Sequence, residues 1–358
     1  MSPRIGLRRI IVATTAVAAI VSPLALAPGA SAAPSPTVGL YGAADPSYDG
    51  AFRQSLAILG LAANDITPPA AAITWLLGQQ CADGSFEPYR GDLTVPCGAP
   101  DPVNFTGPDT NSTALALMAL TALDDSRVKV PAATLSKVVD AAAKAGTWLR
   151  TKQNADGGWP YFAGGASDAN STGLALAGVL TQAPSYGIPA YRKASRFLGG
   201  VSASCSDGGG LAYQPGSTVD GSATAQGLIG LVGPMPVSGP RALATGAACR
   251  ITARSKAASY LARALASAGA LPSATGTGVD YASTSIAVLG LVASGQGRAA
   301  VTRATRTLKA NTAAFVTPDA TSPGAAGLLL MVAEATGGRP TSFGGVNLIS
   351  TLNASIRK

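Results

Sequence analysis

An apolar run that follows a short polar segment headed by aspartate recurs along the chain. The two clearest copies are DTNSTALALMAL at 109–120 and DANSTGLALAGV at 168–179. Weaker copies are DGSATAQGLIGL at 220–231 and DYASTSIAVLGL at 280–291, and blurred ones lie at 47–61 and 318–331. In each copy the aspartate can cap the apolar helix that follows it. The four copies start at positions 109, 168, 220 and 280. Such a regular spacing predicts repeated copies of one supersecondary unit, each of which buries its apolar face against its neighbours.

Helices of a second kind, rich in lysine and arginine, are expected between these segments. The first pair joins a helix at about 51–63 to one that begins at Pro68 and Pro69 and ends near Gln80. The basic helices are expected at about 131–153, 188–200, 251–267, 298–310 and 345–356. The fold class is therefore all-α, with six helical hairpins. A closed ring of them, an (α/α)6 toroid with apolar helices inside and basic helices facing water, accounts for both the count and the composition.

The first 32 residues differ from this repetitive body. Arginines precede an apolar run at 10–26, and an Ala-Ser-Ala triplet at 30–32 suits a cleavage site. We predict a signal peptide at 1–32, a flexible lead-in at 33–47 and a single domain at 48–358, in a secreted, extracellular protein; an uncleaved anchor is the alternative. Later apolar runs are shorter than the ~18 residues of a membrane span, so none is expected after cleavage.

The charged residues and the cysteines indicate which kinds of partner and which covalent bonds to expect. The chain has 26 Lys and Arg, 18 Asp and Glu, no histidine and a net charge of +8. The cations lie mainly on the second kind of helix, so we interpret them as a solvated outer face and expect no nucleic acid partner. Four cysteines in an exported chain favour disulfides. Three pairings are open, and we predict the two local ones, Cys81–Cys97 and Cys205–Cys249. The irregular spacing and the lack of histidine argue against a metal site.

A distinctive turn follows the second helix of a pair. WLLGQQCADGSF at 75–86 is matched by WLRTKQNADGGW at 148–159, and a weaker copy, FLGGVSASCSDGGGLAY, lies at 197–213. We expect Gln79, Gln80 and Gln153 to bond the free carbonyls at the helix end, and Gly84 and Gly157 to supply the left-handed residue that closes the turn.

These turns and the six inner-helix segments resemble the repeat of the squalene/hopene cyclase and protein prenyltransferase superfamily. The resemblance covers nearly the whole mature chain, after the predicted signal peptide, and implies an α/α toroid. The family's catalytic groups are absent: the chain has no Asp-x-Asp-Asp acid, no histidine for zinc and no Asp-Asp-x-x-Asp motif. The lack of histidine also excludes a Ser-His-Asp arrangement.

Six aspartates precede the predicted inner helices: Asp49, Asp109, Asp168, Asp220, Asp280 and Asp319. Capping of free N–H groups accounts for them. In a toroid, however, these helix ends would surround one mouth, where carboxylates and aromatic rings could recognise a ligand. The candidate ligand-binding residues are Asp109, Asp168, Asp220, Asp280, Tyr89, Tyr161, Tyr213 and Tyr281, with Phe105 and Phe162 nearby. The Asp-x-Asn-Ser runs at 109–112 and 168–171 offer oxygen ligands for calcium, but we expect no metal and no catalytic residue.

The resulting hypothesis is a secreted, non-catalytic protein that binds an apolar or amphipathic ligand at the mouth. Its architecture is also similar to that of extracellular cobalamin carriers, so a corrinoid is a candidate ligand; no other cofactor is expected. Two alternatives stay open. One is a terpenoid cyclase, prenyltransferase-like or polysaccharide-degrading enzyme that uses the aspartates of the mouth. The other is a structural or protein-binding component of the cell envelope.

Overall fold

The computed structural model describes residues 37–125, 127–182, 184–273, 277–317 and 319–358. The predicted signal peptide lies outside them. Contacts divide the chain into Met1–Pro34 and Ser35–Lys358, and the second unit carries all of the described structure. This unit is mainly helical, as the sequence predicted, and no helix in its described part is both long and apolar enough to cross a membrane.

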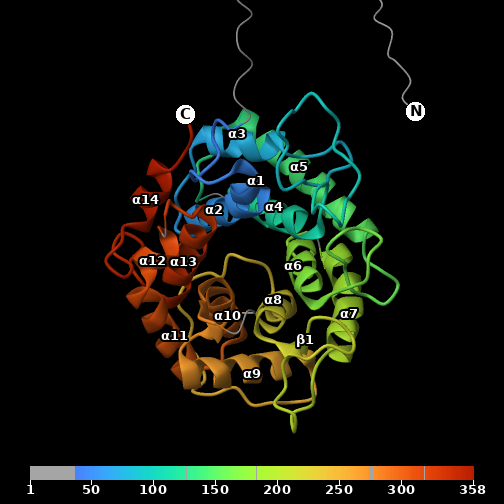
Figure 1. Cartoon of the computed structure of the whole chain (residues 1–358), viewed down its shortest axis with the longest axis vertical. Helices are drawn as coiled ribbons and strands as arrows, with labels where there is room; N and C mark the ends of the chain where they lie inside the picture. Colours follow the sequence, from blue (N-terminus) through green and yellow to red (C-terminus); the bar gives the residue numbers. More distant parts are fainter. Residues whose placement is uncertain (1–36, 126, 183, 274–276, 318) are drawn as a thin grey trace, which may run out of the picture. The chain divides into compact units, whose positions relative to one another are not determined.

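Six inner helices correspond to the six repeated apolar segments (Figure 1). They are α2 (Ala51–Ala63), α4 (Thr110–Leu123), α6 (Ala169–Val179), α8 (Gly221–Val232), α10 (Tyr281–Ser294) and α13 (Pro323–Thr336). Most residues of α4, α6 and α10 are buried. A helix that is apolar all round is stable only when other elements cover it on all sides.

Each inner helix packs against two others of the set. α2 contacts α4 and α13, α6 contacts α4 and α8, and α10 contacts α8 and α13. Glycine permits the closest approaches, because a Cβ at Gly173 of α6 would lie 2.1 Å from the carbonyl oxygen of Gln226 in α8. A Cβ at Gly327 of α13 would lie equally close, 2.1 Å, to the carbonyl oxygen of Leu56 in α2. The high glycine and alanine content therefore serves close helix packing.

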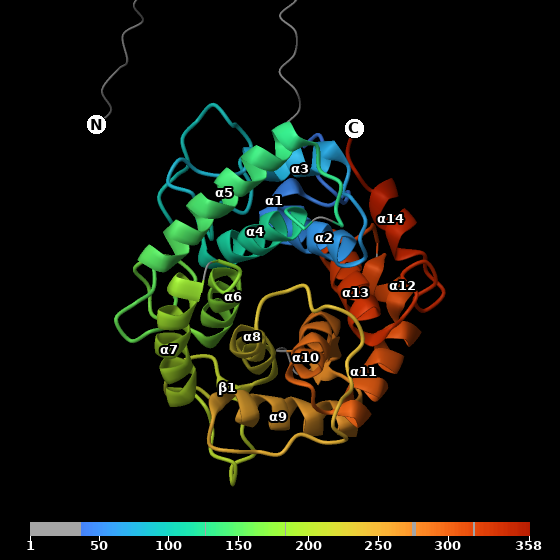
Figure 2. The same cartoon turned by 180° about the vertical axis from the view of Figure 1, so that it is seen from behind.

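The second helix of each pair lies outside this inner set (Figures 1 and 2). These outer helices are α3 (Ala70–Gly78), α5 (Ala132–Thr151), α7 (Pro184–Gly200), α9 (Ala253–Ala268), α11 (Arg298–Ala310) and α14 (Leu348–Ala354). Each of them contacts the inner helix of its own pair. On α11 the apolar face is buried through Ala300, Val301, Ala304 and Leu308, whereas Arg303, Arg306 and Lys309 are exposed. The basic residues of α11 thus form the solvated face that the sequence predicted.

Short β-pairs, which the sequence did not predict, lead into the inner helices. β1 (Leu211–Ala212) pairs with β2 (Val219–Asp220), and β3 (Leu271–Pro272) pairs with β4 (Val279–Asp280), both antiparallel. Leu211 lies opposite Asp220 and Leu271 opposite Asp280. Trp159 and Asp168 form an isolated bridge of the same kind. Each pair fixes an aspartate at the start of an inner helix.

The first and last parts of the described chain meet. The backbone N–H of Gly39 donates to the carbonyl of Arg357, and the N–H of Arg357 donates to Leu40, both at 2.9 Å. Leu40 and Tyr41 are fully buried. The described part of the predicted lead-in at 33–47 therefore contacts the C-terminal segment. Two short helices, α1 (Pro46–Asp49) and α12 (Thr312–Val316), complete the fold.

Candidate functional site

Four of the six aspartates cap the inner helices, as predicted. Asp109 Oδ1 accepts the N–H of Ser112 at 2.8 Å, and Asp168 Oδ1 accepts that of Ser171 at 2.7 Å. Asp220 and Asp280 make the same bond to the third residue after them, at 2.7 and 2.8 Å. In each case the carboxylate binds N–H groups that have no partner within the helix.

The prediction of caps at Asp49 and Asp319 is wrong. The residues that precede α2 and α13 are Gly50 and Ser322, and neither makes a side-chain cap bond. Asp49 ends α1, and its Oδ2 lies 3.0 Å from the guanidinium of Arg357. This buried ion pair joins the two ends of the described chain, whereas Asp319 is exposed in the loop before α13.

A threonine four residues after each capping aspartate completes a repeated hydrogen-bond unit that the sequence analysis missed. The hydroxyl of Thr113 accepts the N–H of Phe86 at 3.0 Å, and the hydroxyl of Thr172 accepts that of Trp159 at 2.9 Å. Thr224 and Thr284 bind Leu211 and Leu271 in the same way, each at 2.9 Å. The signal was available, because all four clear copies share the pattern Asp-x-x-(Ser/Ala)-Thr.

The turns join neighbouring hairpins, but not by the bonds that we expected. Gln80 Nε2 donates to Gly84 within its turn at 3.1 Å and to Ala141 of α5 at 2.8 Å, and Gln153 bonds Gly157 and Ala190 correspondingly. These glutamines thus reach the next outer helix and leave the carbonyls at their own helix end to other donors. Gly84 and Gly157 have φ of 93° and 95°, as predicted.

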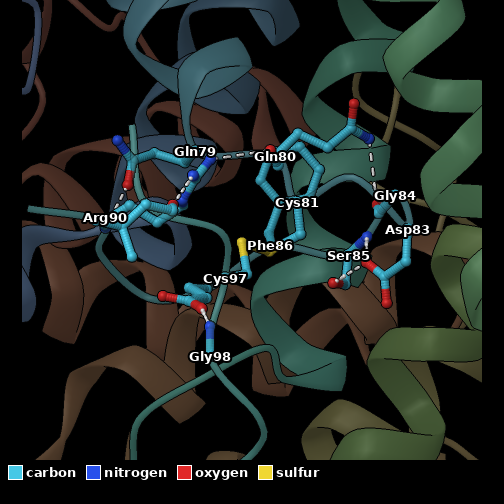
Figure 3. The surroundings of a disulfide bond; sticks show 12 residues. Gln79, Gln80, Cys81, Asp83, Gly84, Ser85, Phe86, Arg90, Cys97 and Gly98 are labelled. Carbon is cyan, nitrogen blue, oxygen red and sulfur yellow. Dashed lines mark hydrogen bonds between the residues drawn. A yellow bond between two sulfur atoms is a disulfide. The ribbon is translucent and has the colours of Figure 1, made fainter. Parts of the chain in front are cut away.

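Both predicted disulfides are present. Cys81–Cys97 closes the loop after the first turn, and Cys205–Cys249 joins the third turn to the segment before α9. Figure 3 shows the first disulfide beside Gln79, whose Oε1 accepts the N–H of Arg90 at 2.6 Å. Among the described residues, Cys81, Glu87 and Cys97 are the one group of three close enough to share a metal ion. The sulfur atoms of Cys81 and Cys97 are bonded to each other, so this group is no metal site.

Asp109 is the most perturbed acid of the candidate set. Its side chain is fully buried, and its Oδ2 has no hydrogen-bond partner in the described part of the chain. Burial raises the pKa of Asp109 from 3.8 to about 6, against the lowering effect of the N–H groups of Ser112 and Asn111. The carboxylate in turn adds to the effect of burial that raises the pKa of Tyr161. Asp109 and Tyr161 therefore lie close enough to interact.

A buried aspartate acts on the pKa of a tyrosine in the next repeat as well. Burial raises the pKa of Asp168, and the pKa of Tyr213 is raised by burial first and by Asp168 second. Backbone hydrogen bonds also place each tyrosine beside the start of an inner helix. The N–H of Thr110 donates to the carbonyl of Tyr161, and the N–H of Ala169 donates to that of Tyr213, both at 2.9 Å. A tyrosine of one repeat thus lies over the inner-helix N-terminus of the repeat before it.

Tyr161, Asp168 and Tyr213 line one pocket of about 400 Å³, which we call the Tyr161 pocket. Its other walls include Pro100, Pro102, Pro160 and Phe162. The rings of Tyr161 and Phe162 meet edge to face at 4.6 Å. Phe105, 67% exposed and with a positive φ of 53°, lies 6.2 Å from both rings. The pocket combines apolar ring faces with phenol groups and one carboxylate.

The other five candidates do not line this pocket. Asp109 lies beneath Tyr161, and Asp220 acts on Tyr260 of α9, whose pKa it raises together with burial. The ring centres of Tyr281 and Phe315 lie 5.5 Å apart, and Tyr89 packs against the core. Asp280 lies at the start of α10. The structure therefore brings three of the eight predicted residues into one cavity.

A second cavity, the central cavity, has a volume of about 180 Å³ and is lined by residues from all six inner helices. Its walls are mainly apolar, and the polar groups among them include Arg53, Gln226 and Ser283. Met235, from the segment between α8 and α9, also lines it and is buried. Its volume is comparable with the ~150 Å³ of an engineered apolar cavity that accepts benzene, so it suits only a small ligand.

Comparisons with known proteins add little to this geometry. No protein-family model and no curated protein matches the sequence. One similar solved structure is described as the crystal structure of a protein from Actinoplanes. It shares 17% identity over 72% of this chain and 80% of that chain, with a TM-score of 0.30, which does not establish a common fold.

Proposed function

We propose that this protein is a secreted, non-catalytic binding protein whose six hairpins form an (α/α)6 toroid of the prenyltransferase and squalene cyclase type. Two features support the toroid: the six repeated sequence segments, and the series of contacts in which each inner helix packs against two others. Two disulfides and the leader-like sequence at 1–32 are compatible with export.

The proposed ligand is an apolar or amphipathic small molecule that binds in the Tyr161 pocket, at the N-terminal ends of the inner helices. The observation that carries this proposal is the convergence of Tyr161, Asp168 and Tyr213 on one cavity. Its volume of about 400 Å³ lies within the range of small-molecule sites. Proline and aromatic walls suit an apolar body, and the phenol groups suit a hydroxyl or cationic group on the ligand. Asp168 is 1% exposed, so it favours a cationic group through its charge and not by contact.

The test is native mass spectrometry of the mature protein from culture medium, before and after incubation with a corrinoid and with a prenyl diphosphate plus Mg²⁺. A retained or acquired mass identifies the ligand class, and titration calorimetry then gives its affinity. Tyr213→Ala should weaken binding about ten-fold or more, as expected for an aromatic residue in a ligand site. Tyr48→Ala, which removes an exposed tyrosine outside the pocket, should leave the affinity unchanged.

Three outcomes would contradict the proposal. Equal binding by wild type and Tyr213→Ala would remove the ligand from the Tyr161 pocket. Loss of binding in Tyr48→Ala alone would move it towards the central cavity, because Tyr48 stacks on Arg53, which lines that cavity. An unliganded mass under every condition would favour the structural or protein-binding alternative.

A second candidate function rests on Asp109. A buried carboxyl with a pKa of about 6 and an unpartnered Oδ2 has the properties of a general acid near neutral pH. Its side chain is 0% exposed, however, so a substrate would reach it only after the groups that bury it moved. Conversion of the prenyl diphosphate by wild type, with loss of turnover in a folded Asp109→Asn variant, would establish this enzyme and replace the binding proposal.

A further inference from the structure

A basic pocket, separate from the Tyr161 pocket, lies beside α11 and the C-terminal ends of α10 and α13. We call it the Arg306 pocket. Its volume is about 450 Å³, and it is lined by, among others, Arg241, Leu243, Val301, Thr305, Arg306 and Lys309. This volume also lies within the range of small-molecule sites.

Three cations border the Arg306 pocket, and its lining contains no acidic residue. Arg241 comes from the segment between α8 and α9, whereas Arg306 and Lys309 lie on α11. None of the three forms an ion pair within the residues that the structure describes. Lys309 Nζ lies 5.3 Å from the ring centre of Phe343, a cation–π contact that supplies no negative charge. The pocket therefore has an excess of positive charge.

A buried hydroxyl in the wall of the pocket also lacks a partner. Thr305 is 9% exposed, and its Oγ1 makes no hydrogen bond in the described part of the chain. Helical threonines usually donate to the carbonyl four residues earlier. Thr336, which also lines the pocket, does so to Val332 at 2.7 Å. A buried unbonded hydroxyl costs about 1–3 kcal/mol, and an acceptor bound beside Thr305 would remove this cost.

The remaining walls are apolar and firmly held. Leu243, Val292 and Val301 contribute hydrocarbon surface. Arg298 holds the segment that carries Leu243 and Arg241, since its guanidinium donates twice to the carbonyl of Leu243, at 3.0 and 2.6 Å. The N–H of Ala244 donates to Gly295 at 2.9 Å in the same place. The two sides of the pocket are thus fixed relative to each other.

We propose that the Arg306 pocket binds an amphipathic carboxylate, a hydrocarbon chain or ring that bears one acidic group. The guanidinium groups of Arg241 and Arg306 and the hydroxyl of Thr305 hold the carboxylate, and Lys309 adds positive charge. The hydrocarbon part lies against Leu243, Val292 and Val301. This site is separate from the Tyr161 pocket and does not depend on the function proposed there.

The test is titration calorimetry of the mature protein at low ionic strength with three probes: octanoate, 1-octanol and inorganic phosphate. Octanoate should bind at one site and bind less tightly as salt is added, because salt screens exposed charges. Octanol lacks the charge and phosphate lacks the hydrocarbon part, so both should bind more weakly.

Two variants and a control locate the site. Arg306→Ala should weaken octanoate binding about ten-fold or more, and Thr305→Val should also weaken it, since each removes a donor to the carboxylate. Arg303→Ala is the matched control, because Arg303 is on the same helix but bonds Ala266 at 3.1 Å and does not line the pocket. Its affinity should match that of wild type. Far-ultraviolet circular dichroism checks that every variant is folded.

The proposal is overturned if octanoate does not bind, or if octanol or phosphate binds as tightly as octanoate. It is also overturned if Arg306→Ala and Arg303→Ala bind octanoate equally. The three cations would then serve to neutralise the C-terminal ends of α10 and α13, where positive charge is favourable.

Discussion

Replacement of Asp109 by asparagine would measure the cost of a buried carboxylate at a helix N-terminus. In the folded protein Oδ1 accepts the N–H of Ser112, Oδ2 has no partner, and burial raises the pKa of Asp109 from 3.8 to about 6. Between these two values the folded protein keeps a proton that the unfolded chain has released. The free energy of unfolding therefore falls as the pH rises through this window, and above about pH 6 the loss is complete.

The size of this loss in the free energy of unfolding follows from the shift in the pKa of Asp109. A rise of about two pKa units corresponds to about 3 kcal/mol, at about 1.36 kcal/mol per unit. Asp109→Asn keeps the acceptor for Ser112 but carries no charge, so this pH-dependent loss should disappear. The new amide N–H₂ has no partner, which costs about 1–3 kcal/mol at every pH. At about pH 8 the variant should therefore be as stable as wild type or up to about 2 kcal/mol more stable, and at about pH 4 it should be less stable.

The assay is urea unfolding of the mature protein, followed by far-ultraviolet circular dichroism, at several values from about pH 4 to about pH 8. Asp220→Asn is the matched control, because Asp220 makes the same cap bond, at 2.7 Å to Ala223, but is partly exposed. Only the difference in slope between variants is interpreted, since other buried acids also titrate. If wild type and Asp109→Asn lose stability in parallel as the pH rises, the carboxylate at Asp109 is not desolvated and the reasoning is refuted.

Two further predictions concern the turns. Thr172→Val leaves the buried N–H of Trp159 without its acceptor and should lower the free energy of unfolding by about 1–3 kcal/mol; an unchanged urea midpoint would show that this bond is dispensable. Gly157 and Gly164 have similar φ, 95° and 90°, but an added Cβ would lie 2.4 Å from the carbonyl oxygen of Lys193 at Gly157 and meet nothing within 4 Å at Gly164. Gly164→Ala should cost about 1–2 kcal/mol, and Gly157→Ala should cost roughly 2 kcal/mol more in thermal or urea unfolding; equal costs would mean that the neighbouring helix yields.

Much of the fold could be predicted because its signals are local. The helix α2 begins and ends where the apolar pattern does, at Ala51 and Ala63, and α11 spans the predicted 298–310. The caps at Asp109 and Asp168 need only an aspartate followed by three residues of helix. The error at Asp49 has a physical cause as well: Asp49 also precedes an apolar segment, but its carboxylate pairs with Arg357, more than 300 positions away, and does not cap the helix.

The candidate site was predictable only in part. An aspartate and a tyrosine in each repeat could be read from the sequence, but not which repeat would supply the tyrosine over a given aspartate. Tyr161 lies over Asp109 and Tyr213 over Asp168 because each turn packs on the inner helix of the repeat before it. Pro100 and Pro102 reach the Tyr161 pocket from the segment between Cys97 and α4, which belongs to no repeat.

The sequence by itself determined most of the helices and four of the six predicted caps, because hydrogen bonds between residues three or four positions apart and apolar periodicity are properties of short segments. For the disulfides it favoured the two local pairs among three possible pairings. Only the tertiary structure decided which aspartates are buried, which tyrosines meet them, and where the Tyr161 and Arg306 pockets lie. The physical reason is that desolvation and cavity shape depend on segments that are distant in the sequence. Asp109 and Asp220 share a motif and a cap bond, yet only the packing around them makes one fully buried and leaves the other partly exposed.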